Sequence, residues 1–344
     1  MTLREFAGLL GLSPTTVSRA LGGYPEVREE TRKRVQDAAR RHGYRPNRRA
    51  ASLATGRAMA IGHVIPMSQD HEMVNPIFAD FIAGAGEVYA EAGYDMILSV
   101  VPEGDEARAY RQLADAGSVD GLIFHGPRTR DPRIGYLKET GLPFVIHGRA
   151  SFDMEGCTFV DIDNEGAFWK ATAFLVKLGH ERIALLNGLE DMDFARRRRA
   201  GYEAALRSAG LSVESSFLSS TEMTEPAGYA AARRLMDADI RPTAFVVSSY
   251  IMAVGVRRAI FDAGLAIGRD VSVVIQDDVL SYLSNGIDKP IFTAMRSSVG
   301  AAGRRCAELL LAQISERTIN PVGEIWDCEL VIGSSTGPAP EATA

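Results

Sequence analysis

From residue 58 onward, short apolar runs alternate with amphipathic segments of helical period. The runs with the length and composition of buried strands are Ala60–Pro66, Asp95–Val100, Gly121–Phe124, Phe144–His147, Phe159–Ile162, Ile183–Asn187, Ala244–Ser248, Val271–Gln276 and Phe292–Met295. The helical segments between most of them include Phe78–Ala92, Glu106–Ala116, Gly166–Leu178, Arg197–Ala209, Gly228–Ala238 and Ile251–Ala263. This alternation predicts parallel sheets that are covered by helices on both faces.

The α/β region is long for a single hydrophobic core. It spans roughly 275 residues, and single cores stop growing at about 250–300 residues. Its pattern falls into two halves near Val160. We therefore expect a two-lobed body over residues 58–333, with the lobe boundary near 160. Residues 334–344 are rich in Pro, Ala and Thr, and we expect a disordered tail there.

The charge of the chain is distributed unevenly. The formal net charge is −6, yet residues 1–57 carry 12 Lys and Arg against 5 Asp and Glu. That part has a net charge of +7, and the remainder has −13. A basic head on an acidic body is typical of a chain in which one part binds a polyanion, although a solvated surface gives the same pattern.

The basic head has the signals of two short helices joined by a tight turn. Thr2 and Glu5 have the spacing of a capping box, which predicts a helix over Leu3–Leu10. Gly11 supplies the turn, and Ser13-Pro14 predicts the start of a second helix that ends near Leu21. This arrangement is a helix-turn-helix, whose second helix can enter the major groove of DNA. A helical hairpin in an unrelated core fits the same signals.

The side chains of the second helix favour the DNA-binding interpretation. Val17, Ala20 and Leu21 are spaced to pack inward. The outward side chains can reach phosphates and base edges, and they are Thr15, Thr16, Ser18 and Arg19. A third helix over Glu29–His42 would complete a small helical domain over residues 1–45.

Residues 46–57 separate this domain from the body. The run Arg48–Ala54 favours helix, and Thr55-Gly56-Arg57 ends it. A helix this short cannot hold alone in water, where ~12–15 residues are marginal. We expect either a hinge helix that folds when it is supported or an ordinary linker.

The head resembles that of the lactose-repressor and galactose-repressor transcription factors. The resemblance rests on Leu12–Leu21, Tyr24–Val27, Glu30–Arg32 and Gly43–Asn47. It continues in the body at Val119–Ile123, Leu178–Ala184 and Val271–Val274, so it covers the chain to about Gly333.

The resemblance implies DNA-contacting residues. Thr15, Thr16 and Arg19 would read the groove, and the phosphate contacts would be Thr2, Ser18, Tyr24, Thr31 and Asn47. The hinge helices of a homodimer would pair in the minor groove, where Leu53 would intercalate and kink the duplex. Pro14 and Thr15 stand where better-known members carry larger polar or aromatic side chains, which leaves the preferred operator bases open.

The resemblance also implies a body similar to the periplasmic sugar-binding proteins, with two doubly wound lobes, crossovers near 288–296 and 320–328, and an effector in the cleft. Ligands of such sheets bind beyond the carboxyl ends of the strands. The candidate effector-binding residues are Phe78, His125, Arg149, Asp163, Arg198, Ser249, Tyr250 and Asp277. Arg198 and Asp277 would anchor ligand hydroxyls and Phe78 would stack on the ligand, whereas a structural role fits His125 equally well. Ser249-Tyr250 replaces the Asn-Asp that is common in the family.

Motifs of enzymes, cofactors and membrane proteins are not found in the sequence. It has no G-x-S-x-G, H-E-x-x-H or Walker motif, and Gly84-Ala85-Gly86 lacks the third Gly of a dinucleotide fingerprint. Cys157, Cys306 and Cys328 have no metal-type or redox spacing, so we expect core residues. No apolar run approaches the ~20 residues that span a bilayer. We expect a cytoplasmic protein that needs no cofactor or metal and contacts no membrane.

Together these features predict a DNA-binding transcriptional regulator and not an enzyme. We expect a sugar-responsive repressor of a carbohydrate operon, which binds a near-palindromic operator on double-stranded DNA as a homodimer and is released by its effector. A purine- or nucleoside-responsive repressor that depends on a corepressor is the alternative. In either case the DNA-bound protein would be associated with the nucleoid.

Overall fold

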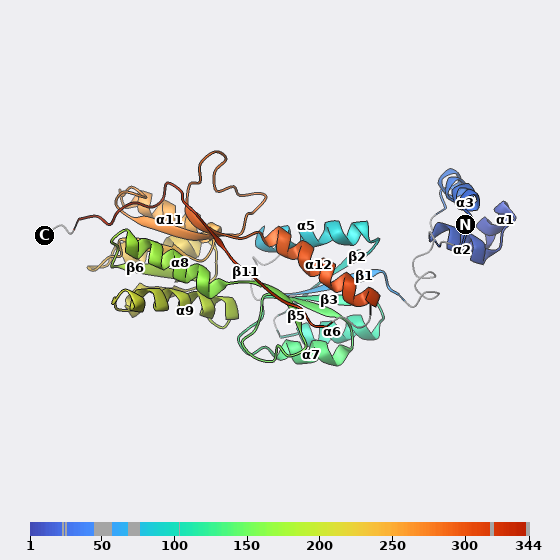
Figure 1. Cartoon of the computed structure of the whole chain (residues 1–344), viewed down its shortest axis with the longest axis horizontal. Coiled ribbons are helices and arrows are strands. Elements are labelled where there is room, and N and C mark those ends of the chain that lie inside the picture. Colours follow the sequence, from blue (N-terminus) through green and yellow to red (C-terminus); the bar gives the residue numbers. More distant parts are fainter. Residues whose placement is uncertain are drawn as a thin grey trace. The chain divides into compact units, whose positions relative to one another are not determined.

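The computed structural model describes residues 1–22, 24, 26–44, 57–67, 76–102, 104–316 and 320–341. The chain divides into two compact units, Met1–Met59 and Ala60–Ala344, and each is described by itself (Figure 1). No helix among these residues is long and apolar enough to cross a membrane.

Among its described residues, the first unit contains α1 (Leu3–Leu10), α2 (Pro14–Leu21) and α3 (Glu29–His42), which confirms the predicted helices. Thr2 and Glu5 form the capping box: the Thr2 N–H donates to Glu5 Oε2 at 2.8 Å, and the Glu5 N–H donates to Thr2 Oγ1 at 3.3 Å. The helices pack around Phe6, whose ring stacks on Tyr44 with centroids 4.2 Å apart. Such a small core leaves much of each helix exposed.

The first lobe of the second unit is a parallel sheet in the order β11-β5-β4-β3-β1-β2. Its strands are β1 (Ala60–Met67), β2 (Asp95–Pro102), β3 (Gly121–His125), β4 (Phe144–His147), β5 (Thr158–Ile162) and β11 (Gly323–Trp326). The helices α5 (Pro76–Glu91) and α12 (Val299–Glu316) pack together on one face, and α6 (Glu106–Asp115) and α7 (Pro132–Thr140) pack together on the other (Figure 1).

The second lobe repeats this plan with the strand order β12-β10-β9-β8-β6-β7. Its strands are β6 (Ile183–Asn187), β7 (Leu218–Ser220), β8 (Ala244–Val247), β9 (Ser272–Asp277), β10 (Thr293–Arg296) and β12 (Glu329–Val331), of which β12 is antiparallel to β10. The paired helices are α8 (Asn164–Lys177) with α9 (Asp193–Ser208), and α10 (Glu225–Met236) with α11 (Tyr250–Asp262). A short 3-10 helix, Ser215–Phe217, precedes β7. The predicted doubly wound fold is confirmed.

The strands read as continuous apolar runs because both of their faces are covered. Along β6, Ala184 and Leu186 pack in the core that includes α10 and α11. Ile183 and Leu185 pack in the core that includes α8 and α9. The sheet of the second lobe is therefore covered on both faces at β6.

Glycines allow the paired helices to approach closely. A Cβ on Gly84 of α5 would lie 2.0 Å from the Gly300 carbonyl oxygen of α12, and one on Gly201 of α9 would lie 2.0 Å from the Glu165 carbonyl oxygen of α8. Such distances are far inside van der Waals contact. Gly84, which the sequence presented as part of an incomplete nucleotide motif, is thus a helix-packing residue.

The chain passes between the lobes at residues 162–164, 296–299 and 326–329. We expected a boundary near 160 and crossovers near 288–296 and 320–328. The later positions arise because β10 completes its pairing with β9 before the chain leaves the second lobe. The first lobe consequently takes α12 and β11 from the far end of the sequence.

The prediction of a disordered tail over 334–344 is wrong for residues 334–341. Ser335 is fully buried: its carbonyl oxygen accepts from the Val273 N–H at 2.8 Å, and its Oγ accepts from the Thr293 N–H at 2.9 Å. Further along, the Ala339 N–H donates to the Leu178 carbonyl at 2.8 Å. Composition predicted disorder, but it does not show that backbone groups of the tail hydrogen-bond to β9 and to the end of α8. Residues 342–344 lie outside the described residues.

Candidate functional site

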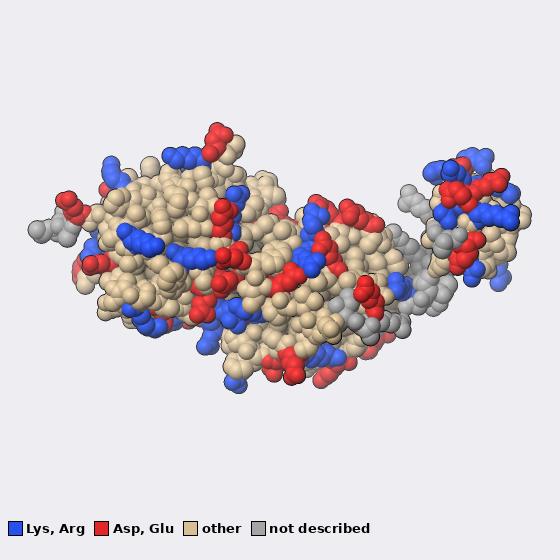
Figure 2. All heavy atoms as spheres, viewed as in Figure 1, with Lys and Arg blue, Asp and Glu red and all other residues tan. Residues whose placement is uncertain are grey.

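The polar face of α2 carries the predicted groove-reading residues. Thr15, Ser18 and Arg19 are exposed, whereas Val17 and Ala20 on the opposite face are fully buried. Thr16 is half-buried, and its hydroxyl lies 2.8 Å from that of Ser13. On the face shown in Figure 2, Lys and Arg side chains cover several parts of the first unit, with Asp and Glu between them. This polar face has the donors and the shape that suit a DNA groove.

The segment after α2 presents Tyr24. Arg32 Nη2 donates to the carbonyl oxygens of Tyr24 at 3.0 Å and Val27 at 3.2 Å, and the Tyr24 side chain is 42% exposed. Thr31 is half-buried in the first turn of α3. Thr2 is exposed and serves as the cap of α1, which leaves its phosphate contact a prediction. Asn47 and Leu53 lie outside the described residues.

In the second unit, Arg198 of α9 is the centre of a buried polar group. Its Nε donates to Asn164 Oδ1 at 2.8 Å, and its Nη1 donates to the Ser248 carbonyl oxygen at 2.7 Å. The guanidinium lies over the rings of Phe168 and Phe194, at 5.0 and 4.8 Å from their centroids. Among the described contacts Nη2 has no protein acceptor, so it remains available to a ligand.

The two carboxyl groups after β9 differ in their partners. Asp277, the predicted anchor, accepts from the Val279 N–H at 3.0 Å and so caps its own loop. Asp278 instead interacts electrostatically with Arg198. Burial raises the pKa of Asp278 to about 6 even though Arg198 favours its charged form. Our predicted set did not include Asp278, because the sequence does not show which of two adjacent residues points into the cleft.

Asn164 joins Arg198 to an ion pair of the first lobe. Arg149 Nε lies 3.0 Å from Asp161 Oδ2, and Asn164 Nδ2 donates to Asp161 Oδ1 at 3.2 Å. Burial raises the pKa of Asp161 to about 6, although Arg149 opposes the shift. Arg149, Asp161, Asn164 and Arg198 thus form a polar chain at the strand ends of both lobes. Asp161 and Asn164 were also absent from our predicted set.

The other predicted residues of the second lobe stabilise local structure. Asp163 accepts from the Gly166 N–H at 3.0 Å and caps α8. Ser249 accepts from the Met252 N–H at 3.1 Å and caps α11, whereas Tyr250 donates its hydroxyl proton to the Ser284 carbonyl oxygen at 3.1 Å. Because the caps use acceptor lone pairs alone, the Ser249 hydroxyl retains its proton for a ligand.

The first lobe contributes aromatic and imidazole rings. His125 is the last residue of β3, and its ring lies edge-on to Phe78 of α5 with centroids 5.1 Å apart. His147 ends the neighbouring strand β4, in register with His125. His63 of β1 lies behind them, with Nδ1 3.1 Å from His125 Nε2. His63 and His147 were not predicted; the position of His147 at a strand end is the signal that could have identified it.

Hydrogen bonds join the two lobes at two places. The Asp193 N–H donates to the Pro127 carbonyl oxygen at 3.1 Å, and Ser151 Oγ donates to Asp193 Oδ1 at 2.6 Å. Elsewhere the Ser281 N–H donates to Asp80 Oδ2 at 2.7 Å. A change in the separation of the lobes would break or remake these bonds.

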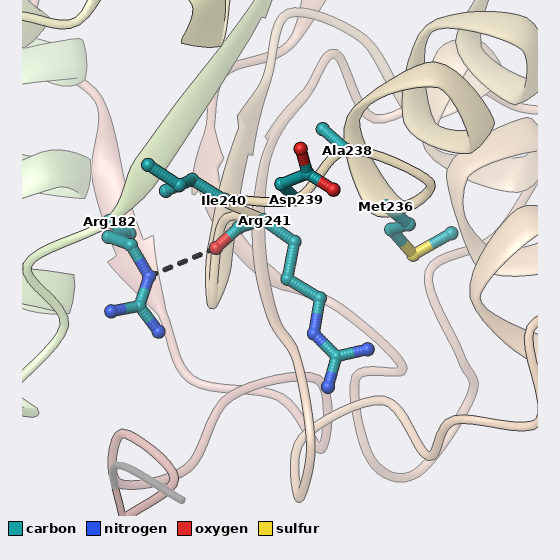
Figure 3. Close-up of a pocket in the computed structure, with 6 residues that line it drawn as sticks. All are labelled: Arg182, Met236, Ala238, Asp239, Ile240 and Arg241. Carbon is teal, nitrogen blue, oxygen red and sulfur yellow. Dashed lines mark hydrogen bonds between the residues drawn. The ribbon is translucent and has the colours of Figure 1, made fainter. Parts of the chain in front are cut away.

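A further pocket of the second lobe is lined by Arg182, Met236, Ala238, Asp239, Ile240 and Arg241 (Figure 3). Arg182 and Arg241 precede β6 and β8, so this pocket lies toward the amino ends of the strands. Arg182 Nε donates to the Arg241 carbonyl oxygen at 3.0 Å (Figure 3). It is separate from the polar chain around Arg198.

A helical unit with a polar α2 face, together with a two-lobed α/β body, defines the chain as a DNA-binding transcriptional regulator. The family model described as "Bacterial regulatory proteins, lacI family" matches residues 2–47, and the "Periplasmic binding protein-like domain" matches residues 172–336. The HTH-type transcriptional regulator AglR of Rhizobium meliloti (strain 1021) is 44% identical over 341 residues, which cover 99% of this chain and 96% of that protein. The chain belongs to the lacI family of bacterial regulatory proteins.

Solved structures of similar fold include complexes with a ligand and with DNA. The structure of the transcriptional regulator CelR in complex with cellobiose has a TM-score of 0.72 and 30% identity, and covers 97% of this chain and 99% of that chain. The structure of the lac repressor dimer bound to operator and the anti-inducer ONPF has a TM-score of 0.83 and 25% identity, and it covers 98% of this chain and 99% of that chain.

Proposed function

We propose that this regulator is a sugar-responsive repressor of a carbohydrate uptake or utilisation operon. It binds a near-palindromic operator as a homodimer and leaves it when a sugar occupies the cleft. In this proposal residues 1–45 bind the half-site, residues 46–57 form the hinge with Leu53 as the wedge, and residues 58–333 bind the effector and the second subunit.

The polar chain from Arg149 to Arg198 is the observation that carries the proposal. Its free donor, Arg198 Nη2, lies in a group that also contains the Asp278 carboxylate. Of two vicinal sugar hydroxyls, one can accept from Arg198 Nη2 and the other can donate to the Asp278 carboxylate. Such hydrogen bonds to charged groups are strong. Phe78 offers an apolar ring of the type that packs against the C–H face of a sugar. The CelR structure contains a disaccharide, which supports the same ligand class.

The contacts between the lobes suggest how occupancy reaches the DNA. A ligand shifts the equilibrium between two conformations of the lobes only if it binds one conformation more tightly than the other. Because the bonds from Asp193 to Pro127 and from Ser281 to Asp80 join the two lobes, such a change would break or remake them. DNA and sugar would then weaken each other's binding reciprocally.

The direct test is a fluorescence-anisotropy titration of the full chain on DNA from its own upstream region. The titration is repeated with mono- and disaccharides, purines and nucleosides. We expect tight binding without ligand and release by one sugar. Binding that appears only with a purine or nucleoside would replace the proposal with the corepressor-dependent alternative, and an absence of specific binding in every condition would contradict both.

A further inference from the structure

A chain of buried polar side chains runs from the core of the first lobe to the carboxyl end of β3. Tyr89 of α5 and His63 of β1 are both almost completely buried, and the Tyr89 hydroxyl lies 3.2 Å from His63 Nε2. His63 Nδ1 lies 3.1 Å from His125 Nε2. The remaining ring nitrogen, His125 Nδ1, is covered from solvent and has no hydrogen-bond partner. The chain therefore ends on one unpaired nitrogen at the carboxyl end of β3.

Each imidazole of this chain carries a single ring proton at neutral pH. Burial lowers the pKa of His63 to about 3 and the pKa of His125 well below its usual value. Neighbouring His147, whose pKa burial lowers to about 4, faces His125 with ring centroids 5.8 Å apart, and its proximity lowers the pKa of His125 further. A neutral imidazole has one N–H donor and one bare acceptor nitrogen, so the direction of one bond sets the direction of the next.

Two proton arrangements satisfy both hydrogen bonds. In the first, the Tyr89 hydroxyl donates to His63 Nε2, His63 Nδ1–H donates to His125 Nε2, and His125 Nδ1 carries a proton. In the second, His125 Nε2–H donates to His63 Nδ1, and His63 Nε2–H donates to the Tyr89 oxygen. The Tyr89 O–H proton then has no acceptor within the core. The Cys306 thiol near Tyr89 is only a weak acceptor and makes no described bond to it.

Each arrangement leaves one unpaired donor; the first is favoured because its donor lies on His125 at the end of β3, where an entering ligand can accept from it, whereas the second leaves its donor on Tyr89 inside the core. We propose that Tyr89 and His63 hold His125 in the tautomer whose Nδ1–H points a donor at the effector. The first lobe then recognises an acceptor oxygen of the ligand, a sugar hydroxyl or ring oxygen held beside Phe78. This inference rests on the effector cleft proposed above; Tyr89 and His63 are positioning residues, and His125 is the contact.

The tautomer can be measured without any ligand. Long-range proton–nitrogen NMR of the full chain with nitrogen-15 histidine distinguishes protonated from bare ring nitrogens, and a His125→Gln sample assigns the His125 signals. We expect the proton on Nδ1 of both His63 and His125. A proton on His125 Nε2 would overturn the inference, whatever the effector proves to be.

Two variants of His63 connect the tautomer to binding. His63→Leu removes the donor to His125, whereas the side-chain amide of His63→Asn can replace Nδ1–H. With cellobiose, maltose, sucrose and trehalose as titration probes, we expect His63→Leu to mix the His125 tautomers and to lower sugar affinity roughly five- to tenfold. His63→Asn should retain the single His125 tautomer and the sugar affinity of the unaltered chain. Melting temperatures recorded for each variant separate this effect from unfolding.

The outcomes distinguish the two proposals. Equal sugar affinity in His63→Leu and in the unaltered chain would remove the positioning role. If none of these sugars binds the unaltered chain while His125 carries its proton on Nδ1, the sugar assignment fails and the donor assignment stands.

Discussion

Arg198 in the second turn of α9 donates from Nε to Oδ1 of Asn164, the first residue of α8, at 2.8 Å. Both side chains are almost completely buried, at 6% and 2% exposure. This bond and the one to the Ser248 carbonyl hold the guanidinium in one orientation. The fixed orientation is the preorganisation that a binding site requires.

Replacement of Arg198 should separate effector sensing from DNA binding. Arg198→Ala removes the donor to the effector, so we expect operator affinity to be retained and release by sugar to be lost. Unpaired Asn164 and Ser248 groups should lower stability by about 1–3 kcal/mol. Anisotropy titrations with and without sugar measure the response.

Arg199→Ala is the matched control, because Arg199 pairs with Glu190 and Glu203 outside the polar chain. A normal sugar response in Arg198→Ala would refute the assignment of Arg198 to the effector site.

Replacement of Asp278 should have a pH-dependent effect on stability. Its folded-state pKa of about 6 exceeds the ordinary value of 3.8, so the folded protein holds the proton more tightly than the unfolded chain does. The unaltered protein therefore loses stability as pH rises from 4 to 6. Asp278→Asn lacks this loss, and we expect its advantage in unfolding free energy to grow over that range by up to about 3 kcal/mol, at about 1.4 kcal/mol per pKa unit.

Urea denaturation of both proteins at pH 4.5 and pH 7 measures that difference. An unchanged difference between the two pH values would show that Asp278 does not titrate in this range. The same variant should lose the effector response, since its amide replaces a carboxylate that accepts from ligand hydroxyls.

Arg19 should contribute to operator recognition. Because its side chain is exposed on the polar face of α2, Arg19→Ala should weaken operator binding by about 1–3 kcal/mol, the usual size of a lost bidentate base contact. Competition with unrelated DNA distinguishes this specific loss from a general loss of charge. Arg40→Ala, which removes a charge paired with Asp37 at the end of α3, should have a much smaller effect. Equal losses of operator affinity in the two variants would show that Arg19 contributes only its charge and makes no base-specific contact.

Gly84 should tolerate no larger side chain. A methyl group there would collide with the Gly300 carbonyl oxygen, so Gly84→Ala should force α5 and α12 apart and lower the unfolding free energy by about 1–3 kcal/mol or more. Thermal unfolding measures the loss. Gly86→Ala on the same helix meets its nearest atom at 3.8 Å and should be neutral or stabilise by up to about 1 kcal/mol. Equal stability of the two variants would contradict the close approach.

Loss of the tail should destabilise the second lobe. A chain that ends at Gly333 lacks Ser335 and its hydrogen bonds with Val273 and Thr293, and it lacks the Gly337 carbonyl, which lies 3.2 Å from His180 Nε2. At about 0.5–1.5 kcal/mol per net hydrogen bond, we expect a loss of about 2–4 kcal/mol. A chain that ends at Glu341 is the control and should unfold like the full chain. Identical melting of all three would mean that the tail contributes nothing.

The order of elements was readable from the sequence because parallel strands covered on both faces need continuous apolar runs, as in Ile183–Asn187. The caps at Thr2 and Ser13 were equally readable, since they depend on residues three apart in the chain. The short strands β7 and β12 were not expected, and residues 320–328 were expected as a crossover and not as the edge strand β11. The half-buried pattern of β11 and β12 lacks a continuous apolar run.

The candidate site was readable only in part. Arg198 was predicted from its family position, whereas its contacts with Asn164 and Asp278 join segments distant in the sequence. His63 lies in the middle of β1, where a histidine gives no local sign that it faces another ring across the sheet. Long-range contacts of this kind set hydrogen-bond direction and pKa, and no local pattern encodes them.

The three passages between the lobes have a consequence for synthesis on the ribosome. When residue 160 has emerged, the first lobe still lacks its edge strand β11 and the helix α12, which covers one face of its sheet. The apolar strands of the first lobe therefore stay partly uncovered until residues 299–326 have been translated. Domains of most chains fold one after another as they emerge. Here the lobe that is translated first is completed only after most of the second lobe has been translated, so a stop codon anywhere before β11 leaves the first lobe incomplete.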